Sequence, residues 1–282
     1  MGRYCTGALV LVFLTGALLE ANALDLHRVT PDGAASAGGK WIVLDARPQK
    51  NWQEGHLPAA LSFSWEALTR TDPDGVRFRI FPPEELSMIL GSMGISHTDA
   101  ILIYGDANSS WGGEGWGIWV LAWLGHQGPI YFLDGGIQAW QDQGKALTTD
   151  LPVKRPPATY QVQVNPDMFW TEDQVAAREK DITLIDTRGY LMEWLPGHLP
   201  GAIHIPWENF YQGKNRTALS SDALKALLEK NGVNLTKPVV YYCTGGIRSG
   251  YAWLVHELSG LPSAVNFEGG TEVWTKKRPL VR

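Results

Sequence analysis

The chain has 282 residues, enough for two domains of ordinary size, and 44% of them are hydrophobic while 19% are charged. This balance indicates a folded globular protein and argues against a disordered one. A net charge of −5, without any run of Lys and Arg, argues against nucleic acid or an anionic membrane surface as a partner.

The first 23 residues have the pattern of an export signal. Arg3 supplies a positive charge, residues 7–19 are almost wholly apolar, and Ala21-Asn22-Ala23 fits the small-x-small rule for cleavage. The apolar run is too short for a comfortable membrane span. We therefore expect residues 1–23 to be removed, and the mature chain to be exported, most simply to a periplasm, without stable membrane insertion. Removal would also take Cys5 and leave Cys243 as the only thiol.

The rest of the chain contains an internal duplication. Four blocks recur in the same order: residues 41–47 and 182–188, 55–60 and 197–202, 101–104 and 239–242, and 133–140 and 267–274. The distance between the copies is far longer than the period of a short structural repeat. The pattern therefore predicts two related domains, over residues 24–150 and 166–282. The Pro-rich stretch 151–165 between them is the predicted linker.

Each copy alternates short apolar runs with amphipathic stretches. In the second copy we expect a helix over 171–179, a strand over 183–185, a helix over 221–230, a strand over 239–242 and a helix over 249–258. Such strands, apolar on both faces, are typical of a parallel sheet covered by helices. Alternation of strands and helices predicts an α/β sheet in each domain.

A glycine-rich turn carries the single mature thiol. Cys243 follows the predicted strand 239–242, and a helix is expected to begin near Gly250. Backbone N–H groups of the turn, the positive end of the helix and the Arg248 cation should all favour a thiolate. We therefore identify Cys243 as a candidate nucleophile; the alternative is a buried, inert cysteine. The candidate substrate-binding residues of the turn are Thr244, Gly245, Gly246, Ile247, Arg248 and Ser249.

The first copy has no thiol at the matching place. It reads Tyr104-Gly105-Asp106-Ala107-Asn108-Ser109, and the Asp106 carboxylate is a hard oxygen nucleophile, ill suited to attack on sulfur. We expect this domain to be catalytically silent. Downstream, Trp116, Trp119 and Trp123 fall on one helix face, which predicts core or domain interface, with an aromatic ligand platform as the alternative.

Taken together, these blocks resemble the rhodanese family of sulfurtransferases in its tandem two-domain form. The resemblance covers nearly the whole mature chain and rests on the Gly-His-Leu-Pro-Gly-Ala block, the segment from Asp186 to Trp194, the cysteine turn and the Glu-Gly-Gly-Thr-Glu-Val-Trp block. It implies a five-stranded parallel sheet flanked by helices in each domain. It also implies transfer of a sulfane sulfur through a persulfide on Cys243, without a cofactor.

The resemblance implies a small-molecule sulfur donor, thiosulfate or a polysulfide, and a cyanide or thiol acceptor. Thiosulfate is the preferred donor, because the turn departs from the Cys-Gly-Ser/Thr-Gly-Val-Thr loop of mercaptopyruvate-type relatives. Arg188 could bind an anion or form an internal salt bridge, and both remain open. His56 and His198 recur in both copies and are expected to be structural. No histidine pair has metal-ligand spacing, so no metal site is predicted.

Two other functions are compatible with a reactive thiol. A binding or redox-sensing module would use Cys243 to report on sulfur species without turnover. A phosphatase or arsenate reductase would need a phosphate-sized loop, and four residues rather than five separate Cys243 from Arg248 here. The shorter turn makes a smaller cradle, which favours a persulfide sulfur over a tetrahedral phosphoryl group.

Overall fold

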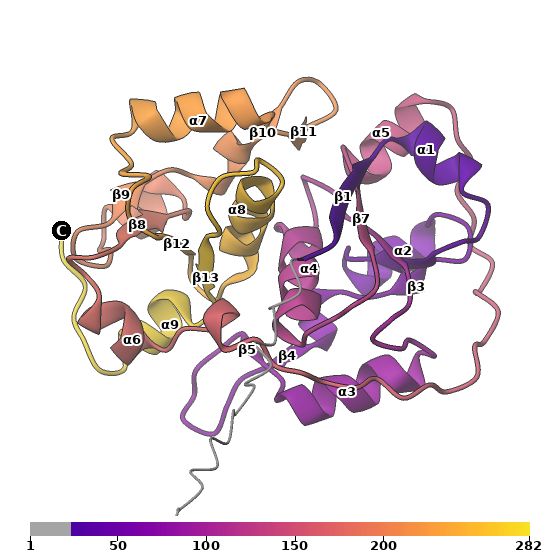
Figure 1. Cartoon of the computed structure of the whole chain (residues 1–282), viewed down its shortest axis with the longest axis horizontal. Helices are drawn as coiled ribbons and strands as arrows, with labels where there is room; N and C mark the ends of the chain where they lie inside the picture. Colours follow the sequence, from indigo (N-terminus) through magenta and orange to yellow (C-terminus); the bar gives the residue numbers. More distant parts are fainter. Residues whose placement is uncertain (1–23) are drawn as a thin grey trace, which may run out of the picture.

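The computed structural model describes residues 24–282, so the predicted export signal, 1–23, lies outside the described part. Two α/β units stand side by side, each built around a parallel sheet (Figure 1). Within residues 24–282, no helix has the length and apolar character needed to cross a membrane.

The N-terminal sheet has the five parallel strands that the resemblance implies. Their spatial order is β1 (Leu26–Val29), β7 (Ile130–Leu133), β6 (Ile101–Tyr104), β2 (Ile42–Asp45) and β3 (Leu61–Ser62). All four residues of the central strand β6 are buried, because helices cover both faces of the sheet. The helices are α1 (Pro31–Ser36), α2 (Gln49–Glu54), α3 (Pro83–Ser92), α4 (Gly113–Trp123) and α5 (Gly136–Asp142). A short turn, η1 (Trp65–Ala67), precedes a hairpin of β4 (Thr69–Arg70) and β5 (Arg79–Ile80).

The C-terminal sheet repeats this plan with four parallel strands. Their order is β13 (Val265–Phe267), β12 (Val239–Tyr242), β8 (Thr183–Asp186) and β9 (Ile203–His204). The helices are α6 (Glu172–Ala177), α7 (Ser221–Lys230), α8 (Ile247–Glu257) and α9 (Gly270–Trp274). The turns η3 (Tyr190–Trp194) and η4 (Trp207–Phe210) and a hairpin of β10 (Tyr211–Gln212) and β11 (Thr217–Ala218) complete the domain.

The prediction of five strands in the second sheet is wrong, because the strand that would match β1 is replaced by a short 3-10 turn, η2 (Pro166–Met168). Pro166 has no N–H to donate to a sheet ladder. The Asn165 side chain accepts a hydrogen bond from the Asp167 N–H, which closes the turn. The Met168 carbonyl accepts a hydrogen bond from the Trp119 indole of α4. The segment therefore lies between its own edge strand, β13, and α4 of the other domain, without joining the sheet ladder.

The predicted helices of the second copy are present, with two changes of boundary. Helix α7 coincides with the predicted range 221–230. Helix α6 begins after Thr171, which forms a capping box with Gln174, but it ends at Ala177. Helix α8 begins at Ile247, three residues before Gly250, because Gly246 adopts the left-handed conformation and caps it. The helix N-terminus is therefore closer to Cys243 than expected.

Helices α4 and α8 pack against each other between the two sheets and join the domains (Figure 1). Two glycines make this close approach possible. A Cβ on Gly250 would lie 2.7 Å from the Trp116 Cα, and a Cβ on Gly115 would lie 2.5 Å from the Tyr251 Cα. Trp119 and Trp123 are buried with Trp116, and both stack on Phe169 of the second domain. The predicted role of the three tryptophans in the core and domain interface is confirmed.

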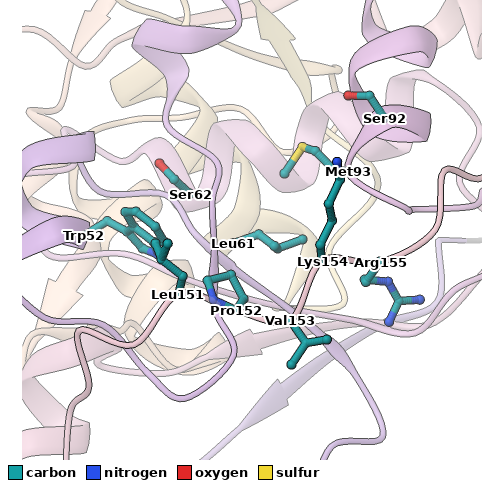
Figure 2. Close-up of a pocket in the computed structure, with 10 residues that line it drawn as sticks. All are labelled: Trp52, Leu61, Ser62, Ser92, Met93, Leu151, Pro152, Val153, Lys154 and Arg155. Atoms are coloured by element: carbon teal, nitrogen blue, oxygen red, sulfur yellow. The ribbon is translucent and has the colours of Figure 1, made fainter.

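The segment between the domains runs along the N-terminal domain without helix or strand over residues 151–165. Its backbone is tied to that domain, since the Ala158 N–H donates to the Gly91 carbonyl and the Gln163 N–H donates to the Leu124 carbonyl. Residues 151–155 line a surface pocket of about 370 Å³ together with Trp52, Leu61 and Met93 (Figure 2). This pocket has no nucleophilic cysteine, so it is not the site of the predicted chemistry.

Candidate active site

Cys243 lies at the C-terminal end of β12, in the wall of a cavity of about 440 Å³ between the domains. Its exposed fraction is only 2%, yet it reaches the cavity, so burial here does not mean isolation from substrate. The carbonyls of Cys243 and Thr244 accept hydrogen bonds from the N–H groups of Thr271 and Glu272. The negative ends of these two carbonyl dipoles therefore point toward α9. The cavity is lined by Trp65, Arg77, Phe78, Trp111, Glu193, Cys243, Thr244, Gly245, Ile247 and Arg248.

Arg248 is held beside the thiol by the carboxylate of Glu193, a residue outside the predicted site. The guanidinium donates to both Glu193 oxygens, at 2.7 and 2.6 Å, and to the Thr244 hydroxyl at 2.9 Å. Thr244 in turn donates to Glu193 at 2.9 Å. Planar, two-point pairing of this kind fixes orientation as well as charge. The positive charge predicted for the turn is present, but Glu193 partly neutralises it.

The protonation states of this pair follow from their mutual contact. Burial raises the pKa of Glu193, but hydrogen bonding and charge from Arg248 outweigh it and lower the pKa to about 2. Burial lowers the pKa of Arg248, while Glu193 and the nearby Cys243 raise it by more. Both groups are therefore ionised at neutral pH, and Glu193 is not available as a general acid.

Arg188 forms the internal salt bridge, which is one of its two predicted roles. Its guanidinium donates to Asp186 at 2.6 Å and to the Gly197 carbonyl at 2.8 Å. Burial lowers the pKa of Arg188, but Asp186 more than offsets this and raises it. In the thiol-free first domain, Arg47 makes the same contacts to Asp45 and to the Gly55 carbonyl, both at 2.6 Å. An arrangement shared with that domain is structural, and Arg188 is not among the residues that line the cavity.

Two other predicted substrate-binding residues, Gly246 and Ser249, are not among the residues that line the cavity. The Ser249 hydroxyl is buried and donates to the Asn266 side chain at 2.7 Å. Asn266 then donates to the Gly246 carbonyl at 3.1 Å, which fixes the start of α8. These residues hold the turn in place, whereas Thr244, Gly245, Ile247 and Arg248 line the cavity itself. The sequence groups all of them together because they are neighbours in the chain.

The histidines of the duplicated blocks have the structural role that was expected. In each copy, Nδ1 of the histidine lies within hydrogen-bond distance of a main-chain carbonyl four residues earlier, at 2.8 Å for His56 to Trp52 and 3.4 Å for His198 to Trp194. Each imidazole also stacks on the ring of the tryptophan whose carbonyl it contacts, His56 on Trp52 and His198 on Trp194. Neither histidine lines the cavity.

Part of the cavity wall comes from the domain that lacks the thiol, and no motif in the sequence marks it. Trp65, Arg77, Phe78 and Trp111 all belong to the N-terminal domain. Phe78 lies on the β4–β5 hairpin and packs directly on the cysteine turn, because a Cβ on Gly245 would lie 2.5 Å from the Phe78 Cβ. Gly245 is thus required by this close approach. Only the duplication itself, which places two domains face to face, offers a hint of this in the sequence.

The same region of the first domain is closed and differently charged. Gly112 caps α4 in the left-handed conformation as Gly246 caps α8, which places Glu114 where the second domain has Arg248. Gly105 follows β6 as Cys243 follows β12. Burial raises the pKa of Glu114 to about 7, and the cavity beside it measures only about 10 Å³. A site without a thiol and without room for a substrate supports the expectation that this domain is silent.

Comparisons with known proteins agree with this geometry. The family model described as "Rhodanese-like domain" matches residues 33–143 and again residues 171–277. The chain is 29% identical over 245 residues to the "Sulfur carrier protein TtuD" of Thermus thermophilus. The aligned region covers 79% of this chain and 83% of that protein. It is 29% identical over 248 residues to a "Putative thiosulfate sulfurtransferase" of Mycobacterium tuberculosis, and the aligned region covers 82% of this chain and 85% of that protein.

Solved structures share the fold at lower sequence identity. EanB in complex with ergothioneine superposes with a TM-score of 0.76 at 23% identity, over 90% of this chain and 69% of EanB. The anaerobic ergothioneine biosynthesis enzyme of Chlorobium limicola gives a TM-score of 0.78 at 22% identity, over 90% and 69% of the two chains. With both domains matched by the family model, the chain belongs to the rhodanese family and carries two rhodanese-like domains in tandem.

Proposed function

We propose that the protein is a sulfurtransferase that moves a sulfane sulfur from a donor such as thiosulfate to cyanide or a thiol, through a persulfide on Cys243. The observation that carries this proposal is the position of Cys243. It is the one cysteine of residues 24–282, it lies in the wall of a cavity, and the N-terminus of α8 and Arg248 are beside it. The relative named "Putative thiosulfate sulfurtransferase" supports the same chemistry.

The proposed reaction has two displacements. The Cys243 thiolate attacks the outer sulfur of thiosulfate, a new S–S bond forms, and sulfite leaves with the electron pair of the broken bond. Cyanide or a thiolate then attacks the terminal sulfur of the persulfide. Thiocyanate or an acceptor persulfide leaves, and the Cys243 thiolate returns. No net proton transfer and no external oxidant is needed.

The residues of the turn stabilise negative charge on the reacting sulfurs in this proposal. The N-terminus of α8 contributes the positive end of the helix dipole. Arg248 adds a fixed cation, and Glu193 together with Thr244 keeps that cation in one orientation. Glu193 and Thr244 are therefore positioning residues, while Cys243 is the catalytic residue.

A second candidate is a sulfur carrier that holds the persulfide and releases it only to a protein. One specific observation favours it: the relative from Thermus thermophilus is named as a sulfur carrier protein. The two functions share the persulfide and differ in whether small acceptors discharge it with turnover.

Thiocyanate release from thiosulfate and cyanide tests the proposal. We expect saturable turnover by the protein with residues 1–23 removed, and none by Cys243→Ser. Thr236→Ser, an exposed substitution outside the cavity, serves as the matched control. Equal turnover by Cys243→Ser would contradict the assignment of the nucleophile. A single stoichiometric burst without turnover would instead favour the carrier.

We also propose that the chain is exported and that cleavage follows Ala23, from the pattern of residues 1–23 alone. N-terminal sequencing of the protein recovered from a periplasmic fraction should give Leu24 as the first residue. Recovery of the full-length chain from the cytoplasm would contradict this proposal.

A further inference from the structure

The small cavity beside Glu114 is built by both domains. Gly105 and Glu114 of the first domain line it together with Tyr211, Arg216 and Tyr251 of the second. It shares no lining residue with the Cys243 cavity, so the two are separate sites. Its volume of about 10 Å³ is close to the least room that a single water molecule needs, and it is too small for any larger ligand.

Buried polar atoms without a partner concentrate in this wall. Within residues 24–282, seven buried side-chain nitrogen or oxygen atoms have no hydrogen-bond partner, and three of them belong to residues that line this cavity. They are Oε2 of Glu114, the hydroxyl of Tyr251 and Nε of Arg216. Glu114 is 3% exposed and Tyr251 is wholly buried, so these two groups are shielded from bulk water. Such groups in folded proteins are normally paired, either directly or through an ordered water.

The three side chains are held in place by contacts of their own. The Tyr211 ring stacks on Tyr251, with ring centroids 4.1 Å apart, and the Arg216 Cζ lies 4.8 Å from the centre of the Tyr211 ring. The Tyr211 hydroxyl donates to Oε1 of Glu114 at 3.2 Å, which leaves Oε2 for another partner. Gly105 allows the carboxyl to approach the main chain closely, because a Cβ at this position would clash with Oε2.

The chemistry of these atoms selects the ligand. Nε of Arg216 only donates a hydrogen bond, a carboxylate oxygen only accepts one, and the Tyr251 hydroxyl does either. Burial raises the pKa of Glu114 to about 7, so both forms of its carboxyl occur near neutral pH. A metal cation would suit only the ionised form and would face the guanidinium, and an anion would suit only the protonated form. Water suits both forms, because it donates to a carboxylate and accepts from a carboxylic acid.

We propose that this cavity binds one water molecule, which accepts a hydrogen bond from Nε of Arg216 and also bonds the Tyr251 hydroxyl and Oε2 of Glu114. Three partners are typical of a buried water. Glu114 belongs to α4, Tyr251 belongs to α8 and Arg216 lies between β10 and β11, so the water bridges the two domains. The thiol-free site therefore has a structural role, which is to join the domains through a bound water.

A crystal structure of the protein, at a resolution that shows other buried waters, tests the site directly. We expect one density peak at hydrogen-bond distance, about 2.7–3.2 Å, from Glu114 Oε2, the Tyr251 hydroxyl and Arg216 Nε. No peak in this cavity, with other buried waters visible, would overturn the inference. Crystals soaked in bromide should show no anomalous signal there, and a signal would identify an anion and overturn the inference as well.

Urea unfolding tests the bridge in solution. Tyr251→Phe keeps the ring stack and removes the hydroxyl, so the folding equilibrium constant should fall by about fivefold to tenfold. A hydroxyl buried without any partner gives the opposite result, because its removal leaves folding unchanged or makes it more favourable. Either of these outcomes would overturn the inference. Tyr241→Phe is the matched control and should cost a similar factor, since the Tyr241 hydroxyl has a direct partner in His256 Nδ1, at 2.9 Å.

A double-mutant cycle shows whether Tyr251 and Arg216 share one ligand. Arg216→Lys keeps the positive charge and removes Nε, and the Tyr251 hydroxyl makes no direct hydrogen bond to this nitrogen. If one water serves both, Tyr251→Phe should cost a smaller factor in the Arg216→Lys background than in the wild type. Equal factors in the two backgrounds would overturn the bridge. Where a variant fails to fold, the wild-type crystal structure still decides the question.

Discussion

Glu193 accepts two hydrogen bonds from the Arg248 guanidinium, at 2.7 and 2.6 Å, and so holds this cation beside the cysteine turn. The pair is mostly shielded from water, with 13% of the Arg248 side chain and 29% of the Glu193 side chain exposed. Breaking one partner of such a pair leaves the other charge uncompensated, which costs more than the pair contributes.

Replacement of Arg248 should therefore lower kcat/KM, moderately when the substitute keeps the positive charge and severely when it does not. Arg248→Lys keeps a charge but loses the planar two-point contact, and kcat/KM should fall by roughly tenfold. Arg248→Met leaves the Glu193 carboxylate unpaired beside the thiolate, and we expect a loss of roughly a hundredfold or more. Steady-state thiocyanate release measures both.

A double-mutant cycle shows whether Glu193 acts through Arg248. Adding Glu193→Gln to Arg248→Met should recover part of the lost kcat/KM, because the unpaired carboxylate is gone. Strictly additive losses would contradict the positioning role of Glu193.

The packing of Phe78 on Gly245 predicts a specific steric effect. Gly245→Ala places a methyl group 2.5 Å from the Phe78 Cβ, so the β4–β5 hairpin must move. We expect the free energy of unfolding to fall by about 1–3 kcal/mol, as in other overpacked sites. Urea unfolding measures this, and Phe78→Gly in the same chain, which removes that Cβ and suits the positive φ, should recover most of the loss. No recovery would show that the methyl group disturbs the turn itself and not the domain contact.

Glu114 should make stability depend on pH. Burial raises its pKa from 4.5 to about 7, so the folded protein holds a proton that the unfolded chain releases at lower pH. This contribution is complete below the unfolded pKa and is lost as pH rises through the folded value. Glu114→Gln should therefore be more stable than wild type at pH 8, by up to about 3 kcal/mol, and similar to it near pH 4. Urea unfolding at both pH values checks this, and parallel pH profiles would contradict it.

The two internal arginine pairs should behave alike. Arg47→Gln and Arg188→Gln each leave a buried aspartate without its partner, and each should lower the free energy of unfolding by about 3–5 kcal/mol. The KM for thiosulfate, measured on the folded fraction, should not change in either variant. A large rise in this KM for Arg188→Gln alone would return Arg188 to the substrate-binding residues.

How much of this structure the sequence predicts depends on how local each feature is. The strand and glycine turn around Cys243 are encoded within a dozen residues, and the duplicated blocks give the two-domain plan. The second sheet lacks a fifth strand where the Met168 carbonyl accepts a hydrogen bond from the Trp119 indole of the first domain. Nothing local in the sequence marks this contact. Glu193 and Phe78 reach the cavity only through tertiary packing, and no periodicity or spacing marks them. Ser249 shows the converse, because a polar neighbour of the nucleophile faces the protein interior instead.

The most direct test of the account is the mass of the Cys243 peptide after incubation with thiosulfate in the absence of any acceptor. We predict that this peptide gains one sulfur atom and that cyanide removes it, while Cys243→Ser protein gains none. A peptide that stays unmodified under conditions of active turnover would contradict the persulfide, and with it the central claim.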